Sequence, residues 1–277
     1  MKRVRDCLVQ DRCTPGYADA RRESELLLAH VLGVSRAWLV AHADDVIDDA
    51  ACAAFAELHA RRARGEPVAY LTGTRGFHAL DLQVTPDVLI PRAETELLVE
   101  LALARIPDNA ECRVADLGTG SGAIALAIAR ERPHAGVLAT DASDAALAVA
   151  RANARRLHLE RVEFAHGDWC AALGDASDFH LIVSNPPYIE ECDPHLLQGD
   201  LRFEPRMALA SGADGLDAIS TIARDARAHL REGGWLLLEH GFEQGSAVRT
   251  LLERHGYHDV FTERDLEQRE RVSGGRR

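Results

Sequence analysis

A glycine-rich loop that joins a strand pattern to a helix pattern is the feature that most constrains how this chain can fold. The apolar run at residues 113–117 leads into the loop, and the apolar run at residues 123–131 follows it. The loop consists of Gly118, Thr119, Gly120, Ser121 and Gly122. Glycines permit a tight turn and let a ligand approach the backbone N–H groups at the start of a helix. The pattern therefore predicts a nucleotide-like ligand at the end of a strand.

Strand and helix patterns alternate along the chain beyond Glu94. Short apolar and β-branched runs predict strands at residues 113–117, 136–141, 162–166, 181–184, 235–239 and 259–262, with a last strand near Arg271. Longer runs with helical periodicity predict helices at residues 123–131, 144–157, 216–230 and 243–256. Such alternation is typical of an α/β fold in which crossover helices cover both faces of a mostly parallel sheet. We expect seven strands, with the ligand outside their carboxyl ends.

The part of the chain before Glu94 has a different pattern. Helical periodicity extends from about residue 19 to residue 65, and Gly33 and Gly65 stand where a left-handed residue would end a helix. Glycine, proline and alternating leucines then replace the helical pattern, which predicts a hairpin. We expect a helical N-terminal domain at residues 1–65, a β-hairpin linker at residues 66–92 and the α/β domain at residues 93–277.

Composition and charge disfavour several classes of function. Hydrophobic residues make up 47% of the 277 residues and charged residues 27%, which is typical of a globular protein with a real core. No apolar run approaches the roughly 18 residues needed to span a bilayer, and polar residues interrupt any secretory signal at the amino terminus. We therefore expect a cytoplasmic protein without a membrane partner. A formal net charge of −12 is unfavourable for unspecific binding to nucleic-acid phosphates, so we expect no direct nucleic-acid partner.

The cysteines and histidines predict neither disulfides nor a metal site. The 6 cysteines include no Cys-x-x-Cys pair, and a chain of this size needs no disulfide to fold. The 13 histidines form no cluster with the spacing of metal ligands. Reduced thiols and the absence of a metal are therefore the expectation.

Acidic residues at the ends of two further predicted strands suggest how a cofactor would bind. The glycine loop alone fits either a nicotinamide dinucleotide or S-adenosylmethionine, because Gly118, Gly120 and Ala123 also match the dinucleotide pattern. Asp141 ends the second strand, where a carboxylate binds ribose hydroxyls, although it could instead cap the next helix. Asp168 can bind an adenine amino group and Trp169 can cover the base, although Trp169 could equally be a core residue.

The sequence Asn185-Pro186-Pro187-Tyr188 ends the fourth predicted strand. Two prolines cannot continue a sheet ladder, so the chain must leave the strand there and present Asn185 at its tip. The Asn185 oxygen and the Pro186 carbonyl can each accept an N–H of a planar amide or amine, and Tyr188 can stack on it. This arrangement would orient a weakly nucleophilic nitrogen for methyl transfer without an acid or a base. A proline-rich turn without function is the alternative.

Seven segments of the chain resemble the bacterial peptide release factor glutamine methyltransferases. The segments are EPVAYLTG (residues 66–73), LIPRAETELLVE (89–100), DLGTGSGAIALA (116–127), IVSNPPYIE (182–190), DPHL (193–196), RFEPRMAL (202–209) and LLLEHG (236–241). The resemblance implies a class I S-adenosylmethionine-dependent methyltransferase fold, which is Rossmann-like, behind a small helical domain that helps to hold the release factor. It also implies that S-adenosylmethionine is the methyl donor, that S-adenosylhomocysteine is the product, and that the acceptor is the Gly-Gly-Gln glutamine of class 1 release factors.

The same resemblance implies roles for individual residues. Residues 118–122, Asp141, Trp169 and Asn185 match the family's cofactor contacts, and residues 185–188 match its glutamine clamp. One departure is Ala93, where the family commonly has a second proline, and this change puts the rigidity of the preceding loop in doubt.

Four other functions share parts of this pattern. A sister family with the same clamp methylates a glutamine of a ribosomal protein, although the Ala-Glu-Thr-Glu-Leu run at residues 93–97 resembles the release-factor branch. An adenine-N6 nucleic-acid methyltransferase would suit the clamp but normally has a basic binding surface. A nicotinamide oxidoreductase would have no use for Asn-Pro-Pro-Tyr. A binding module that has lost its cofactor is disfavoured by the intact glycines and Asp141.

Overall fold

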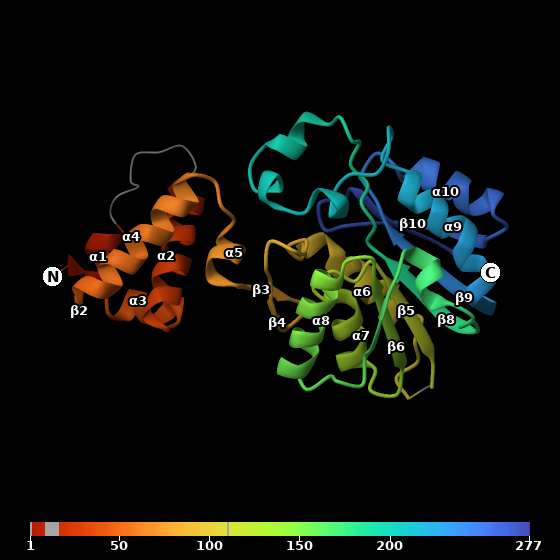
Figure 1. The fold of residues 1–277 in the computed structure, drawn as a ribbon, viewed down its shortest axis with the longest axis horizontal. Helices are drawn as coiled ribbons and strands as arrows, with labels where there is room; N and C mark the ends of the chain where they lie inside the picture. Colours follow the sequence, from red (N-terminus) through yellow and green to blue (C-terminus); the bar gives the residue numbers. More distant parts are fainter. Residues whose placement is uncertain (1, 9–16, 110) are drawn as a thin grey trace. The chain divides into compact units, whose positions relative to one another are not determined.

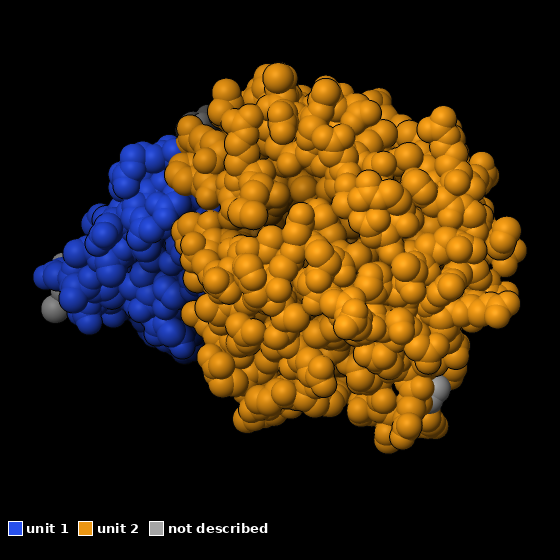
Figure 2. All heavy atoms as spheres, turned by 45° about the vertical axis from the view of Figure 1, so that its right-hand side comes forward, with its two compact units in different colours: residues 1–73 blue, residues 74–277 orange. Residues whose placement is uncertain are grey.

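The computed structural model describes residues 2–8, 17–109 and 111–277. The chain forms two compact units, residues 1–73 and residues 74–277, which are coloured separately in Figure 2. Cys13 lies outside the described residues, and the other five cysteines are free thiols.

The first unit is mainly helical. Its elements are β1 (Lys2–Arg3), α1 (Val4–Cys7), α2 (Tyr17–Leu32), α3 (Arg36–Ala41), β2 (Val46–Ile47), α4 (Asp49–Ala63) and α5 (Val68–Thr72). Side-chain caps begin two of these helices, since Ser35 accepts from Trp38 N at 3.1 Å and Asp48 accepts from Ala51 N at 2.6 Å. Gly33 and Gly65 have φ angles of 65° and 94°, which confirms the two predicted helix stops.

The structure divides the chain at Gly73, whereas the sequence pattern placed the division at Gly65. Helix α5 lies in the predicted linker, and its Leu71 is buried in the core of the first unit. The hairpin of β3 (Thr74–Phe77) and β4 (Leu80–Gln83) belongs to the second unit, because Phe77, Leu80 and Leu82 are buried in that unit's core. The residues predicted as a linker are therefore divided between the two units.

The second unit contains a mostly parallel sheet of seven strands, as the sequence predicts. The strands are β5 (Arg113–Leu117), β6 (Gly136–Asp141), β7 (Glu163–His166), β8 (Phe179–Ser184), β9 (Leu230–Glu239), β10 (His258–Arg264) and β11 (Glu270–Arg276). Their order in the sheet is β10-β11-β9-β8-β5-β6-β7. Strand β11 is antiparallel to both of its neighbours, and the other pairings are parallel.

Helices cover both faces of this sheet (Figure 1). The helices are α6 (Glu96–Leu103), α7 (Ala123–Glu131), α8 (Asp144–Arg156), α9 (Asp217–His229) and α10 (Gly245–Arg254), and the 3-10 turns are η1 (Ala93–Thr95), η2 (Trp169–Leu173), η3 (Pro194–Leu197), η4 (Leu201–Phe203) and η5 (Arg206–Ala208). Successive strand residues alternate between the two cores. Leu181 and Val183 pack with α6 and α7, whereas Ile182 packs with α9 and α10. A sheet buried on both faces leaves its carboxyl edge as the place where loops can form a site.

We expect Leu82→Ala to destabilise the second unit. Leu82 is fully buried, and a leucine-to-alanine change in a core typically costs about 2–5 kcal/mol. Urea unfolding can be followed by tryptophan fluorescence after Trp38 is replaced by phenylalanine, so that only Trp169 and Trp235 of the second unit report. Leu266→Ala, at a fully exposed leucine, is the matched control. Equal unfolding midpoints for the two variants would show that the hairpin is only a linker.

Candidate active site

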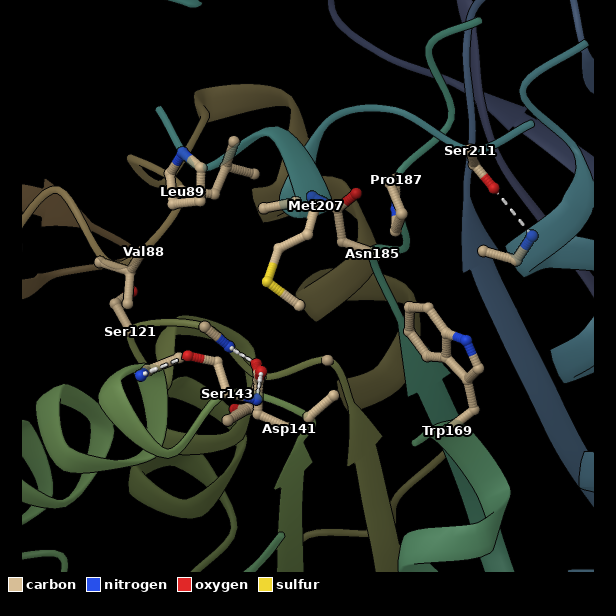
Figure 3. Close-up of a pocket in the computed structure, with 18 of the residues that line it drawn as sticks. Val88, Leu89, Ser121, Asp141, Ser143, Trp169, Asn185, Pro187, Met207 and Ser211 are labelled. Atoms are coloured by element: carbon tan, nitrogen blue, oxygen red, sulfur yellow. Dashed lines mark hydrogen bonds between the residues drawn. The ribbon is translucent and has the colours of Figure 1, made fainter. Parts of the chain in front are cut away.

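A cavity of about 450 Å³ opens at the carboxyl edge of the sheet in the second unit. Its walls bring together most of the site residues predicted from the sequence, as Figure 3 shows for several of them. The predicted residues that line it are Gly118, Thr119, Gly120, Ser121, Asp141, Asp168, Trp169, Asn185 and Pro187. These residues come from the ends of four strands, so the sheet and not a single loop assembles the site.

The glycine loop has a backbone shape that requires glycine. Gly118, Gly120 and Gly122 have φ angles of 73°, 56° and 86°, in the left-handed region. A Cβ atom on Gly118 would lie 3.0 Å from the Trp169 ring. Gly118 is therefore packed closely against the aromatic ring, and residues 118–121 line the cavity, whereas Gly122 is buried and does not line it.

Asp116 holds the glycine loop in place through hydrogen bonds. The carboxylate is fully buried, and its Oδ2 atom accepts from Thr119 Oγ1 at 2.6 Å and from Ala125 N at 3.1 Å. Its Oδ1 atom has no hydrogen-bond partner among the described residues. Burial raises the pKa of Asp116 to about 7, although the two hydrogen bonds oppose this shift. A buried carboxyl group thus joins the end of β5 to the start of α7.

Asp141 lies on the cavity wall and does not cap the next helix. Its Oδ2 atom accepts from Gly120 N and its Oδ1 atom accepts from Ser143 N, both at 2.9 Å. The cap of α8 is Ser143, whose hydroxyl accepts from Ala146 N at 3.2 Å. Each carboxylate oxygen has two lone pairs, so both oxygens can accept a further hydrogen bond from a ligand.

Trp169 contributes both to the cavity and to the core. It follows β7 as the first residue of η2, with a φ of 40°, and part of its ring packs against the core beneath α9. The same residue lines the cavity, next to Asp168. The partly buried Trp169 side chain therefore both packs against the core and lines the cavity, and its contact with an adenine base stays a prediction.

The Asn-Pro-Pro-Tyr segment leaves the sheet after β8, and its four residues lie in two different environments. Asn185 and Pro187 line the cavity, whereas Pro186 and Tyr188 are not among the lining residues. The Tyr188 hydroxyl donates to Glu239 Oε1 at 3.3 Å, and its side chain packs against the second core. The structure therefore does not place the Tyr188 ring where it would stack on a ligand in the cavity.

Two further residues, Thr95 on the cavity wall and Glu239 behind it as the partner of Tyr188, were not predicted from the sequence. Asn185 Nδ2 donates to Thr95 Oγ1 at 3.1 Å, and Thr95 is buried. Glu239 ends β9 and is 1% exposed, and burial raises its pKa to about 7 against the opposing effects of Thr95, Arg271 and Tyr188. The available signal for Glu239 was a charged residue directly after the apolar run at residues 235–238, because buried carboxylates need polar partners.

An ion pair joins two segments of the cavity wall. Arg92 lies within hydrogen-bond distance of Glu204 Oε1, and Ile90 N donates to Glu204 Oε2 at 3.0 Å. The Glu204 side chain is fully buried, whereas that of Arg92 is 30% exposed. Arg92 and the nearby Met207 both line the cavity. Arg92 directly precedes Ala93, so this ion pair holds the segment in which the expected proline is absent.

Comparisons with known proteins identify the family. Residues 13–73 match the PrmC N-terminal domain, and residues 93–198 match the Methyltransferase small domain. The chain is 59% identical over 257 residues to the release factor glutamine methyltransferase of Xylella fastidiosa (strain Temecula1 / ATCC 700964), covering 92% of this chain and 93% of the relative. It is 55% identical over 259 residues to the protein of the same name from Burkholderia pseudomallei (strain K96243), covering 92% and 91%. The chain belongs to the release factor glutamine methyltransferase family.

Membership in this family confirms the resemblance seen in the sequence motifs and the prediction of a methyltransferase. The fold agrees, since a methyltransferase from Pyrococcus furiosus aligns with a TM-score of 0.54 at 17% identity, covering 80% of this chain and 98% of the other. That similarity concerns the fold alone. Among the described residues, none of the helices has the length and apolar character needed to cross a membrane. The roles of individual residues stay predictions.

We expect Glu204→Ala to destabilise this member of the release factor glutamine methyltransferase family. The change leaves Ile90 N–H unpaired and Arg92 without its counter-charge, and removing one partner of a largely buried pair should cost about 2 kcal/mol or more. Glu204→Gln keeps an acceptor for Ile90 and should have an intermediate effect. The measurement is the urea unfolding midpoint, with Asp225→Ala as the control because Asp225 and Arg224 form an exposed pair. Equal midpoints for Glu204→Ala and Asp225→Ala would contradict the expectation.

Proposed function

We propose that this protein transfers a methyl group from S-adenosylmethionine to the side-chain amide nitrogen (N5) of the glutamine in the Gly-Gly-Gln motif of class 1 peptide chain release factors. The reaction leaves S-adenosylhomocysteine and supports translation termination. The observation that carries the proposal is the position of Asn185, whose side-chain amide lines the same cavity as the glycine loop and Asp141. Relatives that share more than half of the sequence bear the name of this activity.

The cavity has features that suit S-adenosylmethionine, which supplies an electrophilic methyl group on a sulfonium centre. Loop residues 118–121 line the cavity just before a helix begins, where a nucleotide-like ligand can approach closely. Asp141 retains acceptor capacity on both oxygens for the two ribose hydroxyls. Asp168 can accept from the adenine amino group, and Trp169 can cover the base.

The acceptor nitrogen needs to be held, because the lone pair of an amide is delocalised and the group is a poor nucleophile. Asn185 Oδ1 accepts one N–H of the glutamine side chain. The proposed acceptor for the other N–H is the carbonyl of Pro186, a buried residue that does not line the cavity itself but lies between two residues that do. Pro187 adds an apolar contact on the cavity wall. Orientation of this kind can supply an effective molarity on the order of 10⁵ M. The proton lost by the nitrogen passes to water afterwards.

The rest of the chain fits a protein substrate better than the alternatives. A net charge of −12 disfavours a nucleic-acid acceptor. The names of the curated relatives refer to release factors, which favours that acceptor over a ribosomal protein. The first unit overlaps the match to the PrmC N-terminal domain, and we propose that it helps to hold the release factor. The intact glycine loop and Asp141 favour an active enzyme over a binding module.

The test is mass spectrometry after incubation of the purified protein with labelled S-adenosylmethionine. A class 1 release factor, total ribosomal protein and total nucleic acid serve as separate acceptors. One methyl group on the Gly-Gly-Gln glutamine supports the proposal. Label on ribosomal protein or nucleic acid alone would overturn the acceptor, and no label together with no calorimetric binding of S-adenosylmethionine would overturn the enzyme.

Asn185→Ala should reduce kcat by about a hundredfold or more, because the acceptor amide loses its orientation. The affinity for S-adenosylmethionine, measured by calorimetry, should change little, since the other cofactor contacts remain. Gln83→Ala removes an exposed amide outside the cavity lining and is the matched control. Wild-type turnover in the Asn185 variant would rule out the clamp.

Asp141→Ala should weaken S-adenosylmethionine binding about tenfold to a hundredfold, the effect expected when hydrogen bonds to a charged group are lost. Asp144→Ala is the control, because Asp144 is exposed on the first turn of α8 and does not line the cavity. Calorimetric titration measures both variants. Equal affinities would remove Asp141 from the binding site.

A further inference from the structure

The last residue of the Asn-Pro-Pro-Tyr segment lies outside the cavity lining but is stiffly connected to the residues inside it. Asn185 and Pro187 line the cavity (Figure 3), whereas Tyr188 does not. A proline ring fixes its own backbone φ angle, so two successive prolines make a stiff connection between Asn185 and Tyr188. Under the proposed function, on which this inference rests, a displacement of Tyr188 is therefore transmitted to the amide that orients the acceptor nitrogen.

Gln244 holds the backbone carbonyl of Tyr188. Its Nε2 atom donates to Tyr188 O at 3.1 Å and to Asp214 O at 3.2 Å, and its Oε1 atom accepts from Gly241 N at 2.8 Å. A carbonyl can only accept and a backbone N–H can only donate, so these partners fix which end of the amide faces which segment. One side chain thus joins the clamp segment, the loop before α9 and the turn after β9.

The position of Gln244 at the start of a helix makes this use of its side chain notable. Gln244 is the N-cap residue of α10, but its side chain is not used to cap that helix. N-cap positions favour Ser, Thr, Asp and Asn, whose short side chains accept from the first helical turn. The longer glutamine side chain extends instead to Gly241 and to the two carbonyl groups. Its hydrogen bonds therefore serve the neighbouring loops and not the start of its own helix.

Gly215 allows this contact to form at close range. The residue is buried, with a φ of 73°, and a Cβ atom on it would lie 2.2 Å from Tyr188 O and 2.7 Å from Gln244 Nε2. Glycine alone combines this left-handed conformation with such a close approach at no steric cost. The Tyr188 carbonyl therefore lies against both the Gly215 backbone and the Gln244 amide.

The other contacts at this end of the clamp act on different atoms. The Tyr188 hydroxyl donates to Glu239 Oε1 at 3.3 Å, which is long for a hydrogen bond between two oxygen atoms. Both backbone groups of Ile189 bond to residues 209–211 at 2.9 Å, but these bonds hold the chain beyond the clamp. The bond from Gln244 is thus the side-chain contact on the last backbone carbonyl of the clamp itself.

We propose that Gln244 is a positioning residue for methyl transfer, which acts through Tyr188 and the two prolines to hold Asn185 in place at the cavity. Gln244 does not line the cavity, and its role requires no contact with the methyl donor or the glutamine. Its bond to Asp214 adds a second link, because the loop of residues 211–217 lines the cavity at both of its ends. One side-chain amide therefore couples the clamp to an adjacent wall of the cavity.

Gln244→Met tests this role with little change in side-chain volume. Methionine cannot form the three hydrogen bonds, so the clamp segment gains freedom and kcat should fall about tenfold. The calorimetric affinity for S-adenosylmethionine should stay close to wild type, because the glycine loop and Asp141 are unchanged. Gln83→Met is the matched control, since Gln83 is exposed on β4 and does not line the cavity.

Gln244→Glu separates the contact with the clamp from the contact with Gly241. An ionised glutamate has nearly the same shape and can still accept from Gly241 N–H, but its other oxygen cannot donate to the Tyr188 and Asp214 carbonyls. We therefore expect kcat to fall at least as far as in Gln244→Met. Negative charge is favourable at the start of a helix, so the urea unfolding midpoint should be no lower than in the methionine variant. A purely structural role would instead preserve activity in the glutamate variant.

A double-mutant comparison shows whether the effect passes through Asn185. Once Asn185 is alanine, there is no side-chain amide to misplace. Gln244→Met should then reduce kcat by a smaller factor in the Asn185→Ala background than in the wild-type background. If Gln244→Met is unfolded at the assay temperature, Gln244→Glu takes its place in the same comparison.

Three results would overturn the role of Gln244. They are wild-type kcat in Gln244→Met, wild-type kcat in Gln244→Glu, and equal factors of loss in the wild-type and Asn185→Ala backgrounds. Failure of the proposed function looks different, because the wild-type protein would then leave the release-factor glutamine unmethylated. If mass spectrometry finds label on another acceptor, the same variants test the positioning role with that acceptor.

Discussion

The parallel pairing of β5 with β8 is the constraint on which the site depends. Leu117 pairs with Ser184 in this register, and the Ser184 hydroxyl donates to the Leu117 carbonyl at 2.6 Å. The next residues along the two strands are Gly118 and Asn185. The glycine loop and the proposed clamp therefore begin side by side although they are far apart in the sequence. A slip in this register would separate them, since each residue of a strand alternates between the two faces.

Two buried carboxyl groups, Asp116 and Glu239, then give shape to the loops that leave these strands. Burial raises the pKa of each to about 7, so neither position is electrostatically favourable by itself. Both carboxyl groups contribute to the structure through the hydrogen bonds that they accept. Asp116 fixes the glycine loop through Thr119 and the start of α7, and Glu239 accepts a hydrogen bond from the Tyr188 hydroxyl. Each carboxyl group thus helps to fix the conformation of a segment that follows a strand.

The sequence predicted those parts of the structure that depend on neighbouring residues. The seven strands, the glycine loop and the helix stops at Gly33 and Gly65 all follow from local periodicity and backbone conformation. The division at Gly73 was not predicted, because it depends on whether Leu71 and Phe77 pack in one core or the other. No local pattern carries that information.

The same reasoning explains what the sequence revealed of the site and what it did not. Asn185 stands out because two prolines follow it, but its partner Thr95 is 90 residues away along the chain, and Glu239 is 51 residues from Tyr188. Such pairs become visible only when the sheet brings their strands together. The proline pair itself has a clear physical consequence, since it forces the chain out of the sheet. The polar residues on either side can then face in different directions, with Asn185 at the cavity and Tyr188 toward the buried carboxyl of Glu239.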